Sequence, residues 1–191
     1  EYLELVYKYW EGSWEDDAPM RDKATGVFAD PSKIHEIRHE SEHFRSEGIF
    51  ISEPSPQRTP LLYQAGASTR GREFAARHAE CVFVSGPSKK VVRDLVRDVR
   101  ERAERNGRDP ADLLFFASMT AIPGRTQAEA EAKHEDYRQY ASLEGTAALY
   151  SRWSGIDLSK YRLDDPIEYV KTNHQQSAVE AYTTADPGRV W

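Results

Sequence analysis

Residues 60–79 read PLLYQAGASTRGREFAARHA, and this stretch decides the fold. The apolar run at 61–63 is typical of a buried strand, and the residues from Ser68 to about Glu80 have a helical composition. Gly66 permits a tight turn, and Ser68 is a residue type that caps helices. The stretch therefore predicts a strand that turns through residues 64–68 into a helix whose N-terminus faces the turn.

Two further strand-and-helix units follow along the chain. Residues 81–84 (CVFV) and 113–117 (LLFFA) are predicted buried strands. Between them Ser88 opens a helix that ends at Asn106-Gly107 and carries an apolar stripe made of Val92, Leu95, Val96, Val99 and Ala103. A capping-box pattern at 126–129 opens another helix, which extends to about Tyr140.

This alternation indicates parallel strands with right-handed crossovers, as in a doubly wound sheet or a (β/α) barrel. A complete barrel has eight strands in roughly 250 residues, so three units correspond to about strands five to seven. The fold class expected is therefore α/β, a partial TIM (β/α)8 barrel. We expect one domain over residues 1–191, with barrel units at 60–142, a hairpin excursion at 31–53 and a C-terminal helical insertion at 143–191.

Both ends of the sequence suggest an internal piece of a longer protein. The chain begins at Glu1, inside an amphipathic helical pattern with neither a methionine nor a signal peptide, and it stops at Trp191 without a tail. A lone piece of a barrel would expose apolar strand edges and helix faces. We therefore expect poor solubility unless the remaining barrel segments are present.

The composition narrows the classes of partner. With 39% hydrophobic and 30% charged residues the chain is globular, and its longest apolar runs are too short for a membrane span. The net charge of −6 argues against nucleic-acid binding, which needs clustered, unbalanced Lys and Arg. Cys81 is the only cysteine, which excludes an intrachain disulfide and indicates a reducing compartment, the cytoplasm.

The turn after the first predicted strand could bind an anion. Residues 66–71 have the glycine spacing of a phosphate loop, but Arg72-Glu73 stands where that loop needs Lys followed by Ser or Thr, so a triphosphate loop is excluded. Ser68 and Thr69 still offer hydroxyls and free N–H groups at the positive end of a helix dipole. A bound phosphate monoester and a simple helix cap are equally compatible with this turn.

A second motif points to zinc. His35, Glu36 and His39 match the HExxH pattern of metalloproteases, which requires a helix to bring both imidazoles to one face. The surrounding residues form no helical stripe, and polar hairpin residues are the alternative interpretation. The basic stretch 89–108 has interleaved acids, so that Asp98 with Arg102, or Glu101 with Arg105, would pair on a solvated helix face.

Several motifs together resemble one family, the FMN-dependent monooxygenases of the bacterial-luciferase superfamily. The family includes nitrilotriacetate, dibenzothiophene-sulfone, long-chain-alkane and dimethylsulfide monooxygenases. The resemblance covers nearly the whole chain, and the approach at 54–60 with the turn at 64–68 most resembles the alkane and dimethylsulfide branch. The motifs that carry it are WEDDA (14–18), ADPSKIH (29–35), PSPQRTP (54–60), QAGAS (64–68), REFAARHAE (72–80) and SGIDLS (154–159).

The resemblance implies a TIM barrel with an insertion that uses reduced FMN and O2 to oxygenate a small organic substrate, such as an alkane or organosulfur compound. Reduced FMN would arrive as a diffusible co-substrate from a separate NAD(P)H:flavin reductase. Ser68 and Thr69 would hold the FMN phosphate, Gly66 would permit close approach, and Gln64 and Ala65 would line the cofactor. The full-length enzyme would be a homo-oligomer.

The resemblance leaves other parts of the site open. Trp153 is a candidate for the substrate pocket, the catalytic residues are expected largely upstream of Glu1, and no metal is expected. The chain alone is not expected to complete the active site. Two alternatives remain, a non-catalytic interaction module that retains only barrel pieces and, with less support, a zinc metalloprotease built on His35, Glu36 and His39.

Overall fold

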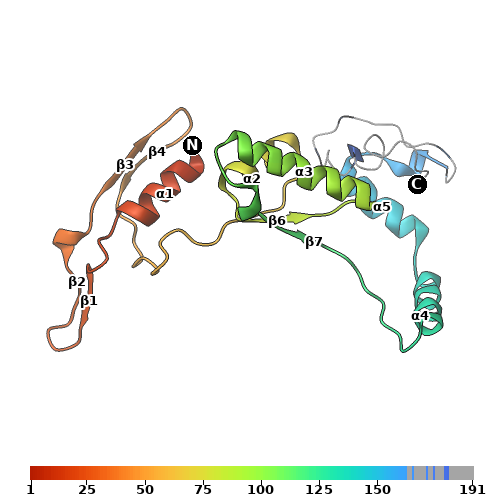
Figure 1. Ribbon diagram of the computed structural model, residues 1–191, viewed down its shortest axis with the longest axis horizontal. Coiled ribbons are helices and arrows are strands. Elements are labelled where there is room, and N and C mark those ends of the chain that lie inside the picture. The colour runs from red at the N-terminus through yellow and green to blue at the C-terminus, as the bar shows by residue number, and fades with distance from the viewer. Residues whose placement is uncertain (163–164, 166–170, 172–173, 175–178, 181–191) are drawn as a thin grey trace. The chain divides into compact units, whose positions relative to one another are not determined.

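The computed structural model describes residues 1–162, 165, 171, 174 and 179–180 (Figure 1). The chain divides into two compact units, Glu1–Leu61 and Leu62–Trp191. The expected single domain with its three segments stays a prediction. Each unit is described by itself below.

The first unit is a helix with two β-hairpins. Helix α1 spans Tyr2–Gly12, as its helical pattern of apolar residues predicts. The side chain of Ser13 holds the next segments together: its hydroxyl donates to the carbonyl of His35 at 3.0 Å and accepts from the N–H of Phe50 at 2.8 Å. The indole N–H of Trp14 donates to the carbonyl of Phe50 at 2.7 Å.

One of the hairpins lies in the segment expected to hold an excursion, and the other was not foreseen. Strands β3 (Ile37–Glu40) and β4 (Arg45–Gly48) pair antiparallel within residues 31–53, after the short 3₁₀ helix η1 (Pro31–Lys33). Strands β1 (Pro19–Asp22) and β2 (Val27–Ala29) form the unforeseen hairpin. Each of these strands has only three or four residues, too few for sequence alternation to reveal.

The second unit contains the strand-and-helix repeats. Strands β5 (Tyr63–Gln64), β6 (Cys81–Val84) and β7 (Leu114–Ala117) form one parallel sheet in the order β5-β6-β7. Helix α2 (Thr69–His78) connects the first pair, and helix α3 (Lys89–Arg105) with the 3₁₀ helix η2 (Pro110–Asp112) connects the second. The predicted parallel order of strands is therefore confirmed.

Capping residues mark the ends of these helices at the positions predicted from the sequence. The Ser88 hydroxyl accepts from the N–H of Val91 at 3.3 Å at the start of α3, and Gly107 takes a φ of +76° just after its end. Helix α4 (Gln127–Gln139) begins with Thr126 accepting from the N–H of Glu129 at 3.2 Å. These are the caps expected from hydroxyl side chains and from a glycine in the left-handed region.

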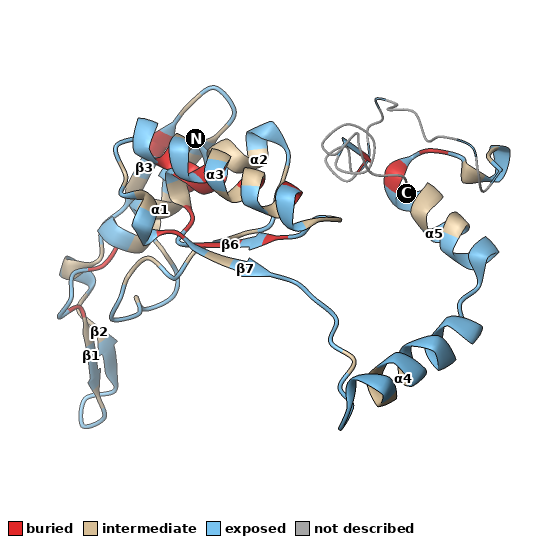
Figure 2. Cartoon of the chain, turned by 45° about the vertical axis from the view of Figure 1, so that its right-hand side comes forward, coloured by how far each residue is buried: buried red, intermediate tan, exposed pale blue. Residues whose placement is uncertain are grey.

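The core lies between the sheet and the two helices that connect its strands. Figure 2 shows buried residues on β6 and on parts of α2 and α3, whereas α4 has no buried residue. The core consists of small and branched apolar side chains: Ala75, Ala76, Ala79, Val82, Val84, Leu95, Val99, Ala103 and Leu113. Small alanines on α2 allow this helix to approach α3 closely.

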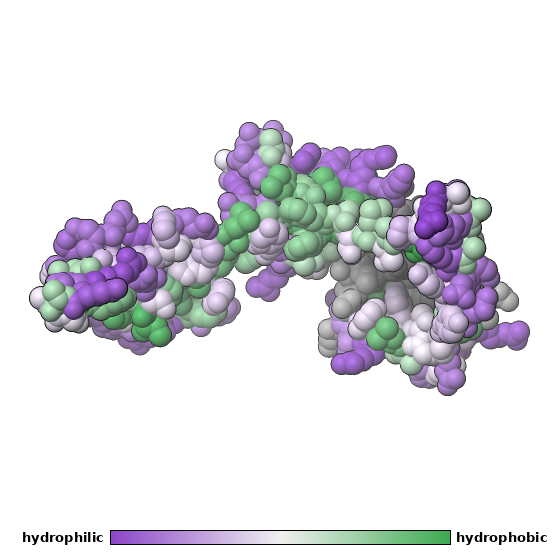
Figure 3. Space-filling model, turned by 90° about the horizontal axis from the view of Figure 1, so that it is seen from below, coloured by the Kyte–Doolittle hydropathy of each residue, from purple (hydrophilic) through white to green (hydrophobic). Residues whose placement is uncertain are grey.

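The prediction that these strands are buried is wrong for one face of the sheet among the described residues. Tyr63 is 52% exposed, Phe83 50% and Leu114 56%, and these side chains share the face opposite the helices. Tyr63, Phe83 and Phe116 contact one another there, with ring centroids 5.6–6.1 Å apart. The space-filling view from below shows a large apolar area (Figure 3). Helices α2 and α3 pack on the other face of the sheet, so the side chains on this face are exposed among the described residues.

Beyond α4 the described chain contains one further α-helix and a short 3₁₀ helix. Helix α5 spans Leu143–Ser154 and ends at Gly155, whose φ is +73°. The 3₁₀ helix η3 (Leu158–Lys160) follows. Much of the predicted insertion segment, including 181–191, lies outside the described residues. No helix among the described residues is both long and apolar enough to cross a membrane.

Candidate functional site

The turn predicted to bind an anion lies at the carboxyl end of β5, where the chain enters α2. Ser68 is the N-cap, and its hydroxyl oxygen accepts a hydrogen bond from the N–H of Gly71 at 3.1 Å. The hydroxyl proton of Ser68 stays available because the serine oxygen acts only as an acceptor in this cap. The capping interpretation is thus confirmed, and it leaves the serine able to donate to an anion.

Two glycines shape this turn by contact rather than by unusual backbone angles. A Cβ built on Gly71 would lie 2.7 Å from the carbonyl oxygen of Gly66, closer than real atoms come. A Cβ on Gly66 would lie 3.2 Å from both the Gln64 amide nitrogen and the Cα of Gly71. Gly66 does not have a positive φ, so its part in the predicted tight turn rests on the close approach of Gly71 to it.

The other predicted cofactor residues lie around the same turn. The side-chain oxygen of Gln64 accepts from the N–H of Ala65 at 2.9 Å, which folds the amide back over the start of the turn. Ala65, Ser68 and Thr69 are exposed, and Gln64 is half-buried. The structure therefore brings all five predicted cofactor residues into one segment of surface.

The donors at this end of α2 suit an anion. In the described part of the chain, the N–H groups of Thr69 and Arg70 have no acceptor, as expected for the first residues of a helix. The first turns of α2 and α3 contain no acidic residue, whereas those of α1, α4 and α5 contain Glu4, Glu129 and Glu144. The partial positive charge of the helix is therefore not neutralised from within, and the residues present fit a phosphate group.

Behind the turn a network of ion pairs ties α2 to α3. Arg72 donates through Nε to the carbonyl of Ala67 at 2.7 Å and through a terminal nitrogen to Asp98 at 3.0 Å. Asp98 also accepts from Nε of Arg102 at 3.1 Å, which is the pair that the i,i+4 spacing predicted. Arg102 reaches Glu73 at 3.2 Å.

This network holds its carboxylates ionised. Hydrogen bonds from Asn106, Arg77 and Arg102 lower the pKa of Glu73 to about 2 from its ordinary 4.5. Partial burial opposes the ionisation of Asp98, but hydrogen bonds from Arg102 and Arg72 outweigh it and lower the pKa of that carboxyl group. Both groups are therefore anions at neutral pH and fully engaged by their cationic partners.

Trp153, the candidate for a substrate pocket, lies elsewhere in the second unit. It is 49% exposed on α5 and lines a hollow of about 550 Å³ with Leu149, Arg152 and His174. The described lining of this hollow includes no residue of the turn at 64–69. Whether Trp153 contacts substrate therefore stays a prediction.

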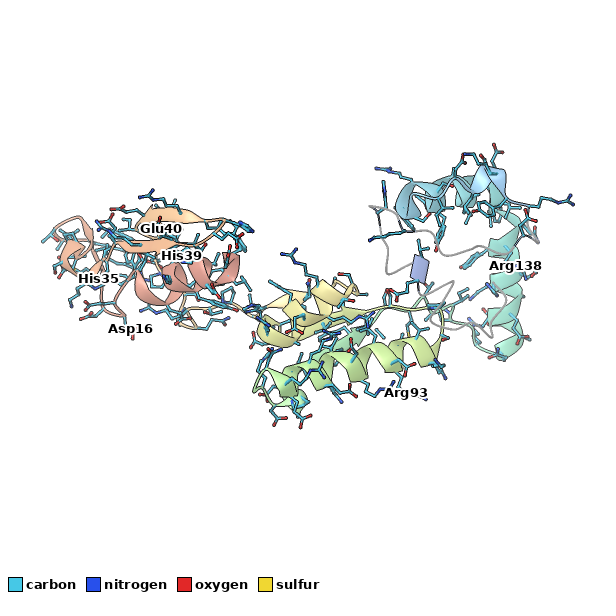
Figure 4. All side chains as sticks on the ribbon, turned by 90° about the horizontal axis from the view of Figure 1, so that it is seen from above. Asp16, His35, His39, Glu40, Arg93 and Arg138 are labelled. Atoms are coloured by element: carbon cyan, nitrogen blue, oxygen red, sulfur yellow. The ribbon has the colours of Figure 1, made fainter. Side chains whose placement is uncertain are left out.

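The zinc alternative is contradicted by the backbone. The stretch from His35 to His39 runs into strand β3 instead of forming a helix, and four residues of extended chain span about 13 Å. His35 pairs with Glu15 at 2.8 Å, while His39 is buried with neither ring nitrogen hydrogen-bonded within the described residues (Figure 4). Among the residues that the structure describes, no group of three His, Cys, Asp or Glu could hold a metal ion.

Sequence reasoning missed three residues that shape the site, Gly71, Arg72 and Asp98. Gly71 stood in the glycine spacing of the turn, and Arg72 was noticed only as a departure from the triphosphate loop. The link between Arg72 and Asp98 joins residues 26 positions apart. Only the packing of α2 on α3 brings them together, so no local signal pointed to it.

Comparison with known proteins finds similar sequences over nearly the whole chain. The family model described as luciferase-like monooxygenase matches residues 1–186. A dimethyl-sulfide monooxygenase from Hyphomicrobium sulfonivorans is 44% identical over 191 residues, which cover 100% of this chain and 40% of the relative. A long-chain alkane monooxygenase from Geobacillus thermodenitrificans (strain NG80-2) is 50% identical over 167 residues, covering 87% of this chain and 38% of the relative.

A solved structure shares the fold. The crystal structure of a riboflavin lyase with modified FMN and the substrate riboflavin superposes with a TM-score of 0.79 at 39% identity, covering 96% of this chain and 41% of that one. The chain spans about 40% of the length of the curated relatives it matches. The α/β units of this chain match part of each larger neighbour, and luciferase-like TIM-barrel monooxygenases are among those neighbours.

Proposed function

Because the chain belongs to the luciferase-like monooxygenase family, we propose that it forms part of a flavin-dependent monooxygenase and supplies the phosphate-binding wall of the FMN site. The three parallel strands would then be about the fifth to seventh of a TIM barrel. In such barrels the active site lies at the carboxyl ends of the strands, which is where the turn at 64–69 is found.

The observation that carries this proposal is the donor set at the start of α2. The free N–H groups of Thr69 and Arg70, with the hydroxyls of Ser68 and Thr69, converge at a helix N-terminus that has no acid of its own. Such a set is suited to a phosphate monoester, the group that distinguishes FMN from riboflavin. The riboflavin lyase, whose structure contains modified FMN, supports a flavin in this fold.

The residues of this chain would bind and orient the cofactor rather than react. Ser68 and Thr69 would donate to the phosphate, Gly66 would let the cofactor approach the backbone, and Gln64 and Ala65 would line its edge. When bound, reduced FMN supplies the reducing equivalents that activate O2, chemistry that no side chain can provide. The protein's part is positioning and the exclusion of water.

The finer assignments follow from the relatives and remain part of the proposal. A dimethyl-sulfide and an alkane monooxygenase are among them, so the proposed substrate is a small, uncharged organic molecule. A separate flavin reductase would supply reduced FMN, and the full-length enzyme would be a homo-oligomer. A reducing location, the cytoplasm, agrees with the single buried Cys81.

The activity is tested with the natural full-length protein, because the curated relatives are more than twice as long as this chain. The protein is supplied with FMN, NADH and an independent flavin reductase, and oxygenated product is measured from dimethyl sulfide and from a long-chain alkane. Substrate-dependent product that requires FMN is expected. If FMN binds but neither substrate is oxygenated, the proposed substrate class is wrong, and a protein that does not bind FMN would contradict the monooxygenase assignment itself.

A further inference from the structure

The side chain of Arg72 is the only guanidinium group bonded to the backbone of the candidate phosphate turn in the described part of the chain. Its Nε donates to the carbonyl of Ala67 at 2.7 Å, and the N–H of Arg72 itself donates to the next carbonyl, that of Ser68, at 2.8 Å. One residue thus fixes two successive peptide groups at the entrance to α2.

This contact sets the direction of a donor. The carbonyl of Ala67 and the N–H of Ser68 belong to one planar trans peptide group, so they point in opposite directions. Because the carbonyl oxygen of Ala67 accepts from the Arg72 guanidinium, which is itself bonded to Asp98 of α3, the N–H of Ser68 points away from that guanidinium. Without Arg72 that peptide could rotate and present a carbonyl oxygen, which repels an anion.

A second contact fixes Arg72 in turn. Asp98 accepts from its terminal nitrogen at 3.0 Å, and Asp98 is itself held by Arg102. Arg72 and Asp98 are both largely covered, with side chains 25% and 26% exposed. The negative charge of Asp98 offsets much of the positive charge of Arg72, so the contribution of Arg72 to the turn is geometric rather than purely electrostatic.

We propose that Arg72 is a positioning residue for the cofactor phosphate, acting through the Ala67–Ser68 peptide and anchored by Asp98 on α3. The inference rests on the proposed function, in which the turn binds FMN. In this proposal the contact between α2 and α3 behind the turn orients the N–H of Ser68 toward the phosphate.

The test compares FMN with riboflavin, which lacks the phosphate, on the natural full-length protein. Dissociation constants for both flavins are measured by fluorescence titration for the wild type, Arg72→Gln and Arg72→Lys. We expect the preference for FMN over riboflavin to fall about tenfold in both variants, because the single ammonium of a lysine does not reproduce the planar guanidinium, which bonds Ala67 and Asp98 through two separate nitrogens. The affinity for riboflavin should stay unchanged.

Arg108 provides a matched control, because its guanidinium also binds α2 carbonyls but at the other end of the helix, at Ala75, Ala76 and Ala79. Arg108→Gln should lower the melting temperature and leave the FMN preference intact. If Arg72→Gln does not fold, Asp98→Asn replaces it, with a smaller drop in FMN preference expected.

The outcomes separate the two proposals. A wild type without any preference for FMN would contradict the site itself. A wild type that prefers FMN, loses that preference in Ser68→Asp and keeps it in both Arg72 variants would overturn the role of Arg72 alone. Retention of the preference in Arg72→Lys but not in Arg72→Gln would show that charge acts rather than geometry, which also overturns the proposal.

Discussion

Gly71 lies against Gly66 so closely that a methyl group on Gly71 would come within 2.7 Å of the Gly66 carbonyl oxygen. The contact joins the first turn of α2 to the turn that precedes it. Both partners are backbone atoms, so neither can move aside as a flexible side chain would.

Gly71→Ala is therefore expected to destabilise the protein by about 1–3 kcal/mol and to weaken FMN binding. Gly145 is the matched control, because it occupies the same third helical position after a serine cap, in α5. A Cβ there would meet only the Ser142 side chain, at 3.2 Å. Gly145→Ala should be neutral or stabilising by up to about 1 kcal/mol. Equal melting temperatures for the two variants would contradict this account of the turn.

Arg108 caps the C-terminal end of α2. Its guanidinium donates to the carbonyls of Ala76 at 2.9 Å and Ala79 at 2.8 Å, groups that α2 itself cannot satisfy. Arg108→Gln should cost about 1–3 kcal/mol in the free energy of unfolding, measured by urea denaturation. Arg105→Gln, at an exposed position of α3, should change it by less than about 0.5 kcal/mol. A similar loss in both variants would show that charge, not capping, is responsible.

The Glu73 network predicts acid sensitivity. A carboxylate whose pKa is lower in the folded state stabilises that state above its unfolded pKa, and the stabilisation disappears as the pH falls toward the folded pKa. For Glu73 this window runs from its ordinary 4.5 down to about 2. The melting temperature should fall across that range and fall less steeply in Glu73→Gln, which starts lower at pH 7. Glu104 is exposed on α3, so Glu104→Gln should keep the wild-type dependence of melting temperature on pH. The same dependence in Glu73→Gln would contradict the lowered pKa of Glu73.

The HExxH match should not bind zinc. The purified protein is expected to contain well under one equivalent of zinc by elemental analysis, and a chelator should leave its melting temperature unchanged. Because the buried ring of His39 gains no hydrogen bond within the described residues, His39→Leu should be tolerated or stabilising. Stoichiometric zinc that is lost in both His35→Ala and His39→Leu would reverse this conclusion.

The parts predicted well from sequence are those set by local chemistry. The stripe from Val92 to Ala103 and the Ser88 cap predicted α3, and CVFV at 81–84 matched β6 residue for residue. Two features were out of reach. The exposed face around Tyr63 and Phe83 depends on what covers the sheet, and apolar runs do not reveal that. The Arg72–Asp98 contact depends on the packing of two helices.

The same division holds for the candidate site. Ser68 and Thr69 could be placed at the start of a helix because a hydroxyl pair at a strand-to-helix turn has a recognisable pattern, and their role toward a phosphate stays a prediction. The backbone contact that requires Gly71 could not be identified, because it depends on the path of the turn rather than on residue type.

The most direct test of the central claim is FMN titration of the natural full-length protein as wild type, Ser68→Asp and Ser88→Asp. Both serines cap helices through their hydroxyls, and aspartate is also a good cap, so both variants should fold. An added carboxylate repels a phosphate only where the phosphate binds. The account predicts at least about a tenfold loss of FMN affinity in Ser68→Asp, with riboflavin affinity and Ser88→Asp unchanged. Equal FMN affinity in all three proteins would show that the phosphate does not bind at α2.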